Sequence, residues 1–443
     1  ITLIASTSEL LAQKGVFTIL TFNDVYDITP DQKGRGGLAE MATLLQEQRA
    51  LAKHSITTVN GDFLSPCILS IFDKGAHKIE LFNQMGVDVV CLGNHEFDFG
   101  PDVVLSRIKE SHFPWITANA IGIDGSYFTG ETQKIIIDVE GIKVGMFGLI
   151  TVETPALSSS GQSVCFAPLV YTAKKMIQEL KAEGAEVIVA LTHLLFEEDL
   201  LLSKEVPEIH VILGGHDHEV MTYCEDQTLV HKSGKNAHYL TRVDLYLDKD
   251  EKTGALHILP SWNVILNYGK EREVESAKVV DRLEEELEKI ISEPVGQIGV
   301  AFDSISGNVR SKETVIGNLI TDSMRDFCHA DIAFISGGII RGNKYYNPGA
   351  YMSVKDLLME LPFGNMIAVI KVTGSVLIQS LENGVSQVEG KAGRFPQVSG
   401  LSFMYDVSRA PGSRIHDVLV KGVPIELDKV YSVATVDYML HGG

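Results

Sequence analysis

The amino-acid sequence predicts an α/β protein of two domains, on three observations. The chain has 443 residues, more than one hydrophobic core of ordinary size accommodates. Short runs rich in Val and Ile alternate with segments of helical periodicity along its first two-thirds, as in layered α/β domains. A charged segment interrupts this pattern before it resumes. We therefore predict an N-terminal domain at 1–270, a linking helix at 271–294 and a C-terminal domain at 295–443.

The N-terminal domain is expected to contain buried strands separated by helices. The strands are predicted from apolar runs with the composition of buried parallel strands, at 16–22, 55–60, 88–92, 142–150, 186–192 and 210–213. The helices predicted between them are 37–51, 78–85 and 171–183. Around 245–262 the pattern changes to antiparallel strands joined by polar turns.

The segment 271–292 has the composition of a long helix. It is highly charged, contains neither Gly nor Pro, and places Val, Leu and Ile at helical spacing until Glu293-Pro294 ends it. A solvated helix on the surface of one domain would have the same pattern, and that alternative stays open. Because α/β patterning restarts after Pro294, we interpret the helix as a connection between domains.

Charge and composition restrict the partners. The formal net charge is −20, which argues against binding nucleic-acid polymers, because that binding depends on Lys and Arg. No run approaches the roughly 20 apolar residues that span a bilayer. A small anionic substrate remains compatible with this charge, because metals and a few arginines can reverse the field locally.

Five scattered cysteines form no disulfide framework and no zinc-type pair, and no Asn-x-Ser/Thr sequon occurs. These features favour a cytoplasmic, reducing compartment. The opening Ile1–Ser6 lacks a Met and a basic flank, as either the remainder of a removed signal or an arbitrary start would.

Polar side chains follow five of the predicted strands at the point where each strand ends. In open α/β sheets ligands bind at the carboxyl ends of strands, so these side chains should converge. Two divalent ions about 3.5–4 Å apart require a bridging carboxylate with oxygen and imidazole ligands on each side. Taken singly, each residue is more often a cap, a turn former or a satisfied histidine. Taken together they predict a two-metal centre made by Asp24, Asp62, Asn94, His193, His216 and His218.

These motifs, with the stretch 183–193 (EGAEVIVALTH), resemble the 5′-nucleotidase family of calcineurin-like metallophosphoesterases over nearly the whole chain. The resemblance implies an N-terminal four-layer α/β/β/α metallophosphoesterase sandwich and a C-terminal α/β substrate-binding domain. It also implies that Asp62 bridges the metals, which would be Zn, Mn or Co. Asp24 and His218 would hold one ion, and Asn94, His193 and His216 the other. The family's habit makes export the alternative to a cytoplasmic location.

The resemblance assigns His95 and Asp98 to catalysis. The His after the Asn ligand faces the phosphate in this family, and a nearby carboxylate, here Asp98, orients it. A cationic imidazole can stabilise developing charge or protonate the leaving oxygen. For Asp98, a simple helix N-cap is the alternative.

Tyr26 departs from the family pattern, which has His at this position. A phenolate ligand would favour a harder, more oxidised ion, so a mixed site containing Fe is expected if Tyr26 binds metal. Alternatively, Tyr26 packs beside the site and water fills the place of the missing ligand.

The C-terminal domain resembles the substrate-binding half of the family in three motifs, 316–322, 336–341 and 361–365. The resemblance implies that two aromatic rings stack on a base and that two arginines bind phosphate or ribose. The alternative for the two rings is that they are ordinary core aromatics. Ser336 replaces an Asn that contacts the base, and the chain stops at His441-Gly442-Gly443, before the acidic residue expected at the ribose. The candidate substrate-binding residues are Arg310, Arg341, Phe363, Asn365 and Tyr438.

We therefore expect a phosphoric ester hydrolase that converts a nucleoside 5′-monophosphate to nucleoside and phosphate, by attack of a hydroxide held between two metals. The alternatives on the same machinery are a sugar phosphate, a 2′,3′-cyclic nucleotide, a nucleotide sugar or a thiosulfate-type ester. A catalytically silent binding protein with a decayed metal site is the alternative from another class. The pairing of His95 with Asp98 favours an enzyme.

Overall fold

The computed structural model describes residues 15–130, 132–225, 228–250, 253–363 and 365–440. The opening 1–6, the end of the chain at 441–443, and Gly364 in the third C-terminal motif lie outside these ranges. The chain divides into two compact units, Ile1–Glu285 and Glu286–Gly443, and we describe each by itself. Within the described ranges, no helix is long and apolar enough to cross a membrane.

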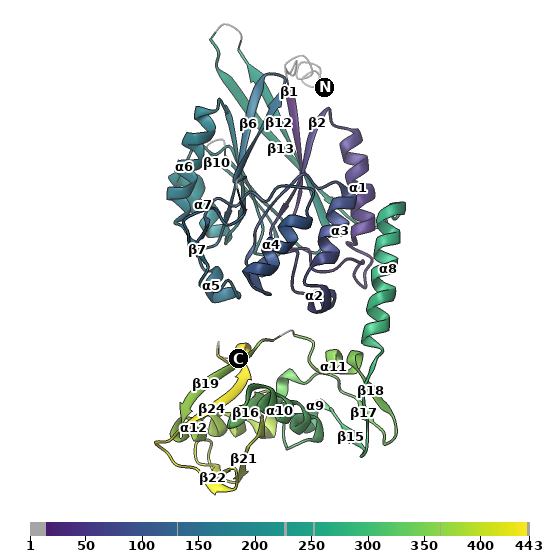
Figure 1. Cartoon of the computed structure of the whole chain (residues 1–443), viewed down its shortest axis with the longest axis vertical. Coiled ribbons are helices and arrows are strands. Elements are labelled where there is room, and N and C mark those ends of the chain that lie inside the picture. Colours follow the sequence, from purple (N-terminus) through teal and green to yellow (C-terminus); the bar gives the residue numbers. More distant parts are fainter. Residues whose placement is uncertain (1–14, 131, 226–227, 251–252, 364, 441–443) are drawn as a thin grey trace, which may run out of the picture. The chain divides into compact units, whose positions relative to one another are not determined.

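Two β-sheets form the centre of the N-terminal unit (Figure 1). One has five strands in the order β13-β12-β1-β2-β3, and the other has six in the order β10-β11-β9-β8-β6-β5. The strands are β1 (Gly15–Phe22), β2 (His54–Asn60), β3 (Val89–Cys91), β5 (Lys134–Val139), β6 (Ile142–Ile150), β8 (Val187–His193), β9 (Val211–Gly214), β10 (Val220–Glu225), β11 (Thr228–Ser233), β12 (Tyr239–Lys249) and β13 (Leu256–Leu266).

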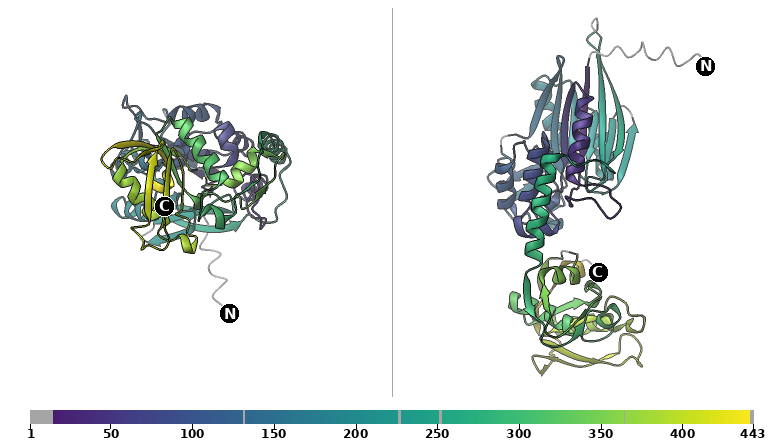
Figure 2. Two further views of the ribbon diagram at one scale, coloured as in Figure 1. Left: turned by 90° about the horizontal axis from the view of Figure 1, so that it is seen from below. Right: turned by 90° about the vertical axis from the view of Figure 1, so that its right-hand side faces the viewer.

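Three apolar cores make this unit a four-layer α/β/β/α sandwich, as predicted. Strand β1 shows why: Phe17 and Ile19 point into the core between the sheets, whereas Leu20 and Phe22 point to the helices on the other face. The first sheet is covered by α1 (Leu38–Ala50), α3 (Ala76–Met85), α4 (Pro101–Glu110) and α8 (Val274–Ile291), and the second by α6 (Leu169–Ala182) and α7 (Phe196–Glu205). Two further views show this layering (Figure 2).

Short elements complete the unit around these layers. They are α2 (Ile68–Asp73), η1 (Asn94–Phe97), β4 (Ala120–Gly122), α5 (Thr154–Leu157) and β7 (Val164–Phe166). The linking helix predicted at 271–294 is shorter in the structure, where α8 begins at Val274 and ends at Ile291, and the division between the two units falls inside that helix.

The C-terminal unit contains a four-stranded sheet of order β19-β24-β16-β20. Strand β16 alternates, because Ala333 and Ile335 join the core with α10 while Ile332 and Phe334 join the core with α12. The main elements are α10 (Val315–Cys328), β16 (Ile332–Ser336), β19 (Ile367–Thr373), α12 (Gly374–Val385), β20 (Pro396–Ser399) and β24 (Val430–Val436).

Smaller elements surround this sheet. Three strands pair as β21-β22-β23, and two further pairs are β14-β18 and β15-β17. The bounds are β14 (Pro294–Gln297), β15 (Phe302–Asp303), α9 (Ser306–Val309), η2 (Gly337–Ile339), β17 (Tyr345–Tyr346), β18 (Tyr351–Ser353), α11 (Val354–Glu360), η3 (Val388–Gly390), β21 (Leu401–Tyr405), β22 (Ile415–Val420), β23 (Val423–Pro424) and α13 (Asp437–Leu440).

Candidate metal centre and substrate cavity

The six predicted ligands lie where parallel strands end. Strands β1, β2 and β3 are parallel neighbours, as are β8 and β9, so their carboxyl ends share one edge of each sheet. Asp24, Asp62, His216 and His218 have φ angles of 54°, 56°, 84° and 63°. Backbone in this left-handed region is strained for residues other than Gly, and such strain collects at functional sites. The strain turns these side chains out of the sheet edge.

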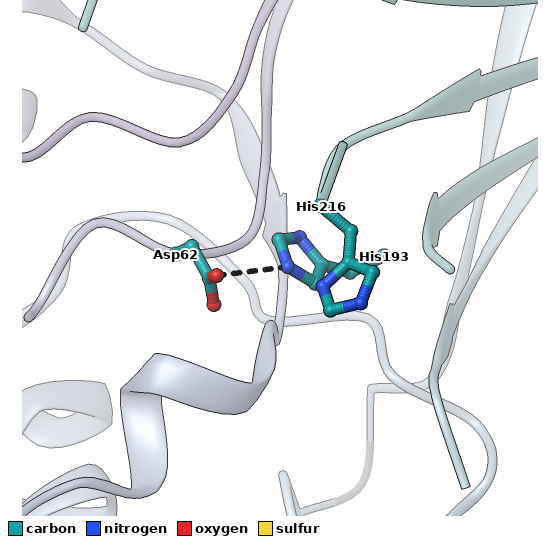
Figure 3. Close-up of side chains that lie close together, drawn as sticks. All are labelled: Asp62, His193 and His216. Carbon is teal, nitrogen blue, oxygen red and sulfur yellow. Dashed lines mark ion pairs between the residues drawn. The ribbon is translucent and has the colours of Figure 1, made fainter. Parts of the chain in front are cut away.

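The first cluster contains Asp62, His193 and His216, whose ligand-type atoms all lie within 4.8 Å of one another (Figure 3). His193 Nε2 lies 3.0 Å from Asp62 Oδ2. Its Nδ1 donates to the carbonyl oxygen of Asn60 at 2.8 Å, which fixes the tautomer and directs Nε2 to the cluster. Burial opposes the charged ring, but Asp62 raises the pKa of His193 to about 10. The cluster therefore holds a proton where a cation could bind.

Gly215 explains the close approach of the second sheet to the first. A Cβ at this position would lie 2.7 Å from His193 Nδ1 and 2.9 Å from Asp24 Oδ2, too close for any larger residue. The backbone N–H of the next residue, His216, donates to Asp24 Oδ2 at 2.9 Å. The glycine thus brings both sheets to one site.

The second cluster contains Asp24, His218 and Tyr26. His218 Nε2 lies 3.3 Å from Asp24 Oδ1. The Tyr26 hydroxyl lies 2.7 Å from His218 Nε2, 3.2 Å from Asp24 Oδ1 and 3.5 Å from Asp62 Oδ2. Asp62 therefore belongs to both clusters. Burial, followed by the charges of Asp62 and Asp24, raises the pKa of Tyr26, so the phenol is neutral beside these carboxylates.

His95 stands beside this centre and is held by Asp98. His95 Nδ1 lies 2.8 Å from Asp98 Oδ2, and Ser158 Oγ donates to the other oxygen of Asp98 at 2.7 Å. The ring centroids of His95 and Tyr26 are 6.2 Å apart. Burial lowers the pKa of His95, but the hydrogen bond with Asp98 and the charge of Asp62 raise it to about 9. Asp98 caps no helix N-terminus, since Gly100 occupies that position of α4.

Glu96 supports the centre, and the sequence analysis missed it. Its buried carboxylate accepts backbone N–H bonds from Asp62 and Phe63 at 2.8 Å, from Leu64 at 3.1 Å and from Gly93 at 2.5 Å. It thereby ties the Asp62 loop to the Asn94 loop. Burial and the neighbouring Asp62 charge raise the pKa of Glu96. The only sequence signal for it is its place inside the motif Gly93–Phe97.

Lys232 is a second support that the sequence analysis missed. Its ammonium is buried, donates to the carbonyl oxygen of Gly215 at 2.7 Å, and pairs with Asp199 at 3.2 Å and with Asp217. A buried Lys requires such partners. The interaction with Gly215 fixes the turn that carries His216 and His218.

The donor atoms fit divalent cations. Carboxylate and amide oxygens with imidazole nitrogens are the usual ligands of Zn, Mn and Co. Asn94 Oδ1 is buried and forms no hydrogen bond within the described part of the chain, and the buried His193 Nε2 has its ion pair with Asp62 as its one polar contact there. Buried polar atoms normally have a partner. A cation coordinated by both atoms would provide one.

The five predicted substrate residues line one cavity of about 760 Å³ in the C-terminal unit. Arg310, Arg341, Phe363, Asn365 and Tyr438 all contribute to its wall. The cavity is further lined by Ser336 and by the turn Ala392-Gly393-Arg394. Arg394 on that turn donates to Asn383 at 2.9 Å and was not predicted, because an Arg after a glycine is usually a surface residue.

The four-layer sandwich and its cluster of strand-end ligands define the class as a calcineurin-like phosphoesterase fold. The family model for calcineurin-like phosphoesterases matches residues 17–220, and the model for the 5′-nucleotidase C-terminal domain matches residues 294–443. The chain therefore belongs to the 5′-nucleotidase family of calcineurin-like metallophosphoesterases. Members of this family are phosphoester hydrolases that act on nucleotides, and divalent metal ions are implied for them.

Similar proteins come from bacteria and animals. The trifunctional nucleotide phosphoesterase YfkN of Bacillus subtilis is 30% identical over 96% of this chain, which spans 32% of that protein. The venom 5′-nucleotidase of Gloydius brevicauda is 29% identical over 96% of the chain and 81% of its own length. The solved structure of a 5′-nucleotidase precursor from Thermus thermophilus has a TM-score of 0.64 and 27% identity, covering 97% of this chain and 90% of that one.

Proposed function

We propose that the chain hydrolyses nucleoside 5′-monophosphates to nucleoside and phosphate. One observation carries this proposal: the chain combines a cluster of metal-type ligands beside an imidazole with a separate cavity lined by arginines and exposed aromatic rings. The first can act on a phosphate ester and the second can bind a planar base. The two properties together favour a nucleotide over a sugar phosphate.

In this proposal Asp62 would serve both of two divalent cations. Asp24 and His218 would help to hold one, with Tyr26 as a further candidate, and Asn94, His193 and His216 would help to hold the other. When bound, such ions would neutralise charge on the phosphoryl group and acidify a water molecule for attack on phosphorus. Zn, Mn or Co suits this donor set, and the Tyr26 oxygen would add affinity for Fe.

His95 is the proposed general acid. Asp98 holds Nδ1, which leaves Nε2 to donate a hydrogen bond to the phosphoryl group. Against the effect of burial, the hydrogen bond with Asp98 raises the pKa of His95 and favours the protonated ring. When the ester bond breaks, Nε2 can give its proton to the leaving ribose oxygen, and Asp98 stabilises the positive ring until that transfer. Removing His95 should therefore slow the chemical step.

The cavity of the C-terminal unit is the proposed recognition site. Its volume suits a small ligand. Phe363 and Tyr438 are 54% and 52% exposed, so their rings are available to stack on a base. The Arg341 guanidinium lies 5.0 Å from the centre of the Phe363 ring, and that contact positions both groups. Arginines suit the phosphate and ribose oxygens.

A panel of substrates tests this function on protein loaded with Mn²⁺, Zn²⁺ or Co²⁺. Phosphate release from AMP, ribose 5-phosphate, 2′,3′-cyclic AMP, UDP-glucose and p-nitrophenyl phosphate would be compared. We expect AMP to have the highest kcat/KM. If AMP were hydrolysed no faster than p-nitrophenyl phosphate, nucleotide specificity would be wrong. If no ester were hydrolysed with any metal, the chain would be a binding protein.

A further inference from the structure

A second group of titratable side chains lies in α2 and α3, outside the metal centre. Cys67 directly precedes α2, Asp73 ends it, and His77 is in the first turn of α3. Cys67 Sγ lies 3.6 Å from His77 Nε2 and 2.8 Å from Ser70 Oγ. Both oxygens of Asp73 lie 2.9 Å from His77 Nδ1. The thiol, the imidazole and the carboxylate therefore form a continuous chain.

We propose that Cys67 is a reactive thiolate and a site of oxidation by hydroperoxides, with His77 and Asp73 as positioning residues. The order of contacts is that of an activated nucleophile: the Cys67 thiol contacts one nitrogen of the His77 ring, and the Asp73 carboxylate orients the ring through the other nitrogen. Cys67 is partly exposed, whereas His77 is buried. A reagent from solvent can thus reach Cys67, which is partly exposed like Asp73, while the His77 ring between them stays enclosed.

The same residues do not form a metal site. Asp73 occupies His77 Nδ1, which leaves only the sulfur and Nε2 as possible ligands. Within the described residues, a metal-type group of three ligands occurs at Asp62, His193 and His216 and does not include Cys67. The cluster therefore suits thiol chemistry.

The electrostatic surroundings agree with the geometry. Burial raises the pKa of the Cys67 thiol, but the Lys78 ammonium, the His77 ring and the Ser70 hydrogen bond lower it to about 6. The Lys78 ammonium is fully buried and also feels the charges of Asp27, Asp73 and Glu96. A thiolate near neutral pH is the reactive form of cysteine.

Lys78 links this thiol to the loop after β1. Its ammonium donates to the carbonyl oxygens of Val25 at 2.8 Å and Tyr26 at 2.5 Å. Loss of the thiolate charge would thus be felt by a cation that holds the Asp24–Tyr26 backbone. Lys78 thus connects the surroundings of Cys67 with the backbone of the loop that carries Tyr26.

The oxidation needs only a hydroperoxide as co-reactant. The Cys67 thiolate attacks one peroxide oxygen; an S–O bond forms and the O–O bond breaks. The sulfur loses two electrons, the peroxide is reduced by two, and the leaving hydroxide or alkoxide takes up one proton. The product is a sulfenic acid, which thiols can reduce.

Alkylation rates measured against pH test the thiolate. The full chain would be treated with limiting iodoacetamide, and each cysteine quantified by peptide mass spectrometry, with the more exposed Cys165 and Cys224 as internal references. A thiol of pKa about 6 holds roughly 75-fold more thiolate at pH 6.5 than an ordinary thiol of about 8.5, and its weaker nucleophilicity reduces this to about sixfold. We expect Cys67 to react about sixfold faster than both at pH 6.5 and about tenfold slower at pH 9.5. Equal or slower reaction at pH 6.5 would overturn the proposal.

Substitution of the relay tests its geometry. In Asp73→Asn, the rate of Cys67 at pH 6.5 should fall at least about threefold because the ring loses its orienting charge. Asp102→Asn on α4, an exposed carboxylate in a first helical turn, is the matched control and should leave the rate unchanged. If Asp73→Asn does not fold, His77→Asn serves instead. An unchanged rate in the folded variant would refute the relay.

Hydrogen peroxide tests the oxidation itself. With a 1,3-diketone trap present at pH 6.5, we expect the sulfenic acid adduct at Cys67 before any adduct at Cys165 or Cys224. Cys67→Ser should remove that adduct and leave the others unchanged. Trapping first at the reference cysteines would show that Cys67 is not the peroxide-reactive site.

Discussion

The metal centre of the N-terminal unit and the cavity of the C-terminal unit are built in opposite ways. Asp62 and His193 are 1% and 0% exposed, whereas Phe363 and Tyr438 are 54% and 52% exposed. Four of the six proposed metal ligands have positive φ, but none of the five proposed substrate residues does. The centre that would perform the chemistry is therefore enclosed and strained, and the cavity that would recognise the substrate is open and relaxed.

The two sites also differ in how their residues are held in place, with more fixed positions in the N-terminal unit than in the C-terminal cavity. Glu96 and Lys232 hold the ligand loops through backbone groups, so the positions of the ligands are fixed by the fold. In the cavity, the contact between Arg341 and Phe363 joins two side chains. Chemistry on a phosphoryl group requires fixed positions to a fraction of an ångström, whereas stacking on a base tolerates small shifts. Substitutions at the two sites should therefore affect different kinetic parameters.

His95→Ala should have the largest effect, on kcat. Loss of a positioned general acid reduces turnover by about 10²- to 10⁴-fold, while KM for AMP changes little. Metal content, measured by mass spectrometry of the elements, should stay at the wild-type value. His112→Ala, an exposed histidine on the same unit, is the control. Loss of metal together with activity would mean that His95 is a ligand.

Phe363→Ala should have the next largest effect, on KM. Removing one stacked ring costs about 1–3 kcal/mol, so KM for AMP should rise roughly 5- to 150-fold. Ribose 5-phosphate lacks a base, so its KM should change much less, only through the lost contact between Phe363 and Arg341. Phe327→Ala removes a ring that is 80% exposed on α10 and should affect neither substrate. Equal losses with AMP and ribose 5-phosphate would contradict base stacking.

Tyr26 lies within the proposed metal centre, where it serves either as a ligand or as a packing residue, and substituting it distinguishes the two roles. We expect a loss of metal affinity that is smaller than the loss of turnover in His95→Ala. In Tyr26→Phe the hydroxyl near Asp24, Asp62 and His218 is lost, so one of the two ions should bind about tenfold more weakly. Tyr26→His restores a ligand and should restore affinity. Metal titration with calorimetry measures both variants. Unchanged affinity in Tyr26→Phe would show that the hydroxyl only packs against the centre.

A layered α/β fold and the convergence of the candidate ligands could be predicted from sequence, because both depend on strands, whereas the four-layer arrangement was expected only from the resemblance to the family. A buried run of Val and Ile marks a strand, and parallel strands bring their carboxyl ends to one edge. The polar residues after 16–22, 55–60 and 88–92 could therefore be grouped without knowing any distance. The strand pattern does not predict which N-terminal helices pack on which sheet, because that depends on the sheet face that each helix covers.

The supporting residues could not be predicted, for a different physical reason. Glu96 and Lys232 have side chains that are usually solvated, and only the fold shows that they are buried against backbone groups. Asp73 and His77 are four residues apart, but the left-handed turn at Lys74 ends one helix before the next begins, so a continuous helical pattern does not predict their contact or that of His77 with Cys67. Arg394 reaches the cavity from a turn that shares no motif with Arg310 or Arg341.

The smallest predicted effect is on the stability of the C-terminal unit and concerns Asp331, a carboxylate at the surface, unlike the buried Glu96. The interaction with Lys421, then those with Ser432, lower the pKa of Asp331 to about 2, whereas burial raises that of Glu96. A carboxyl whose pKa is depressed on folding stabilises the protein above its unfolded pKa of about 3.9, and this stabilisation is lost as the pH falls towards 2.

Asp331 is 41% exposed, so solvent screening limits the effect to at most about 1 kcal/mol. Asp331→Asn should therefore lower the unfolding midpoint in urea slightly at pH 6 and by clearly less at pH 2.5, while Asp428→Asn on the exposed turn before β24 should change neither. A loss that was undiminished at pH 2.5 would assign the stabilisation to the hydrogen bonds with Ser432.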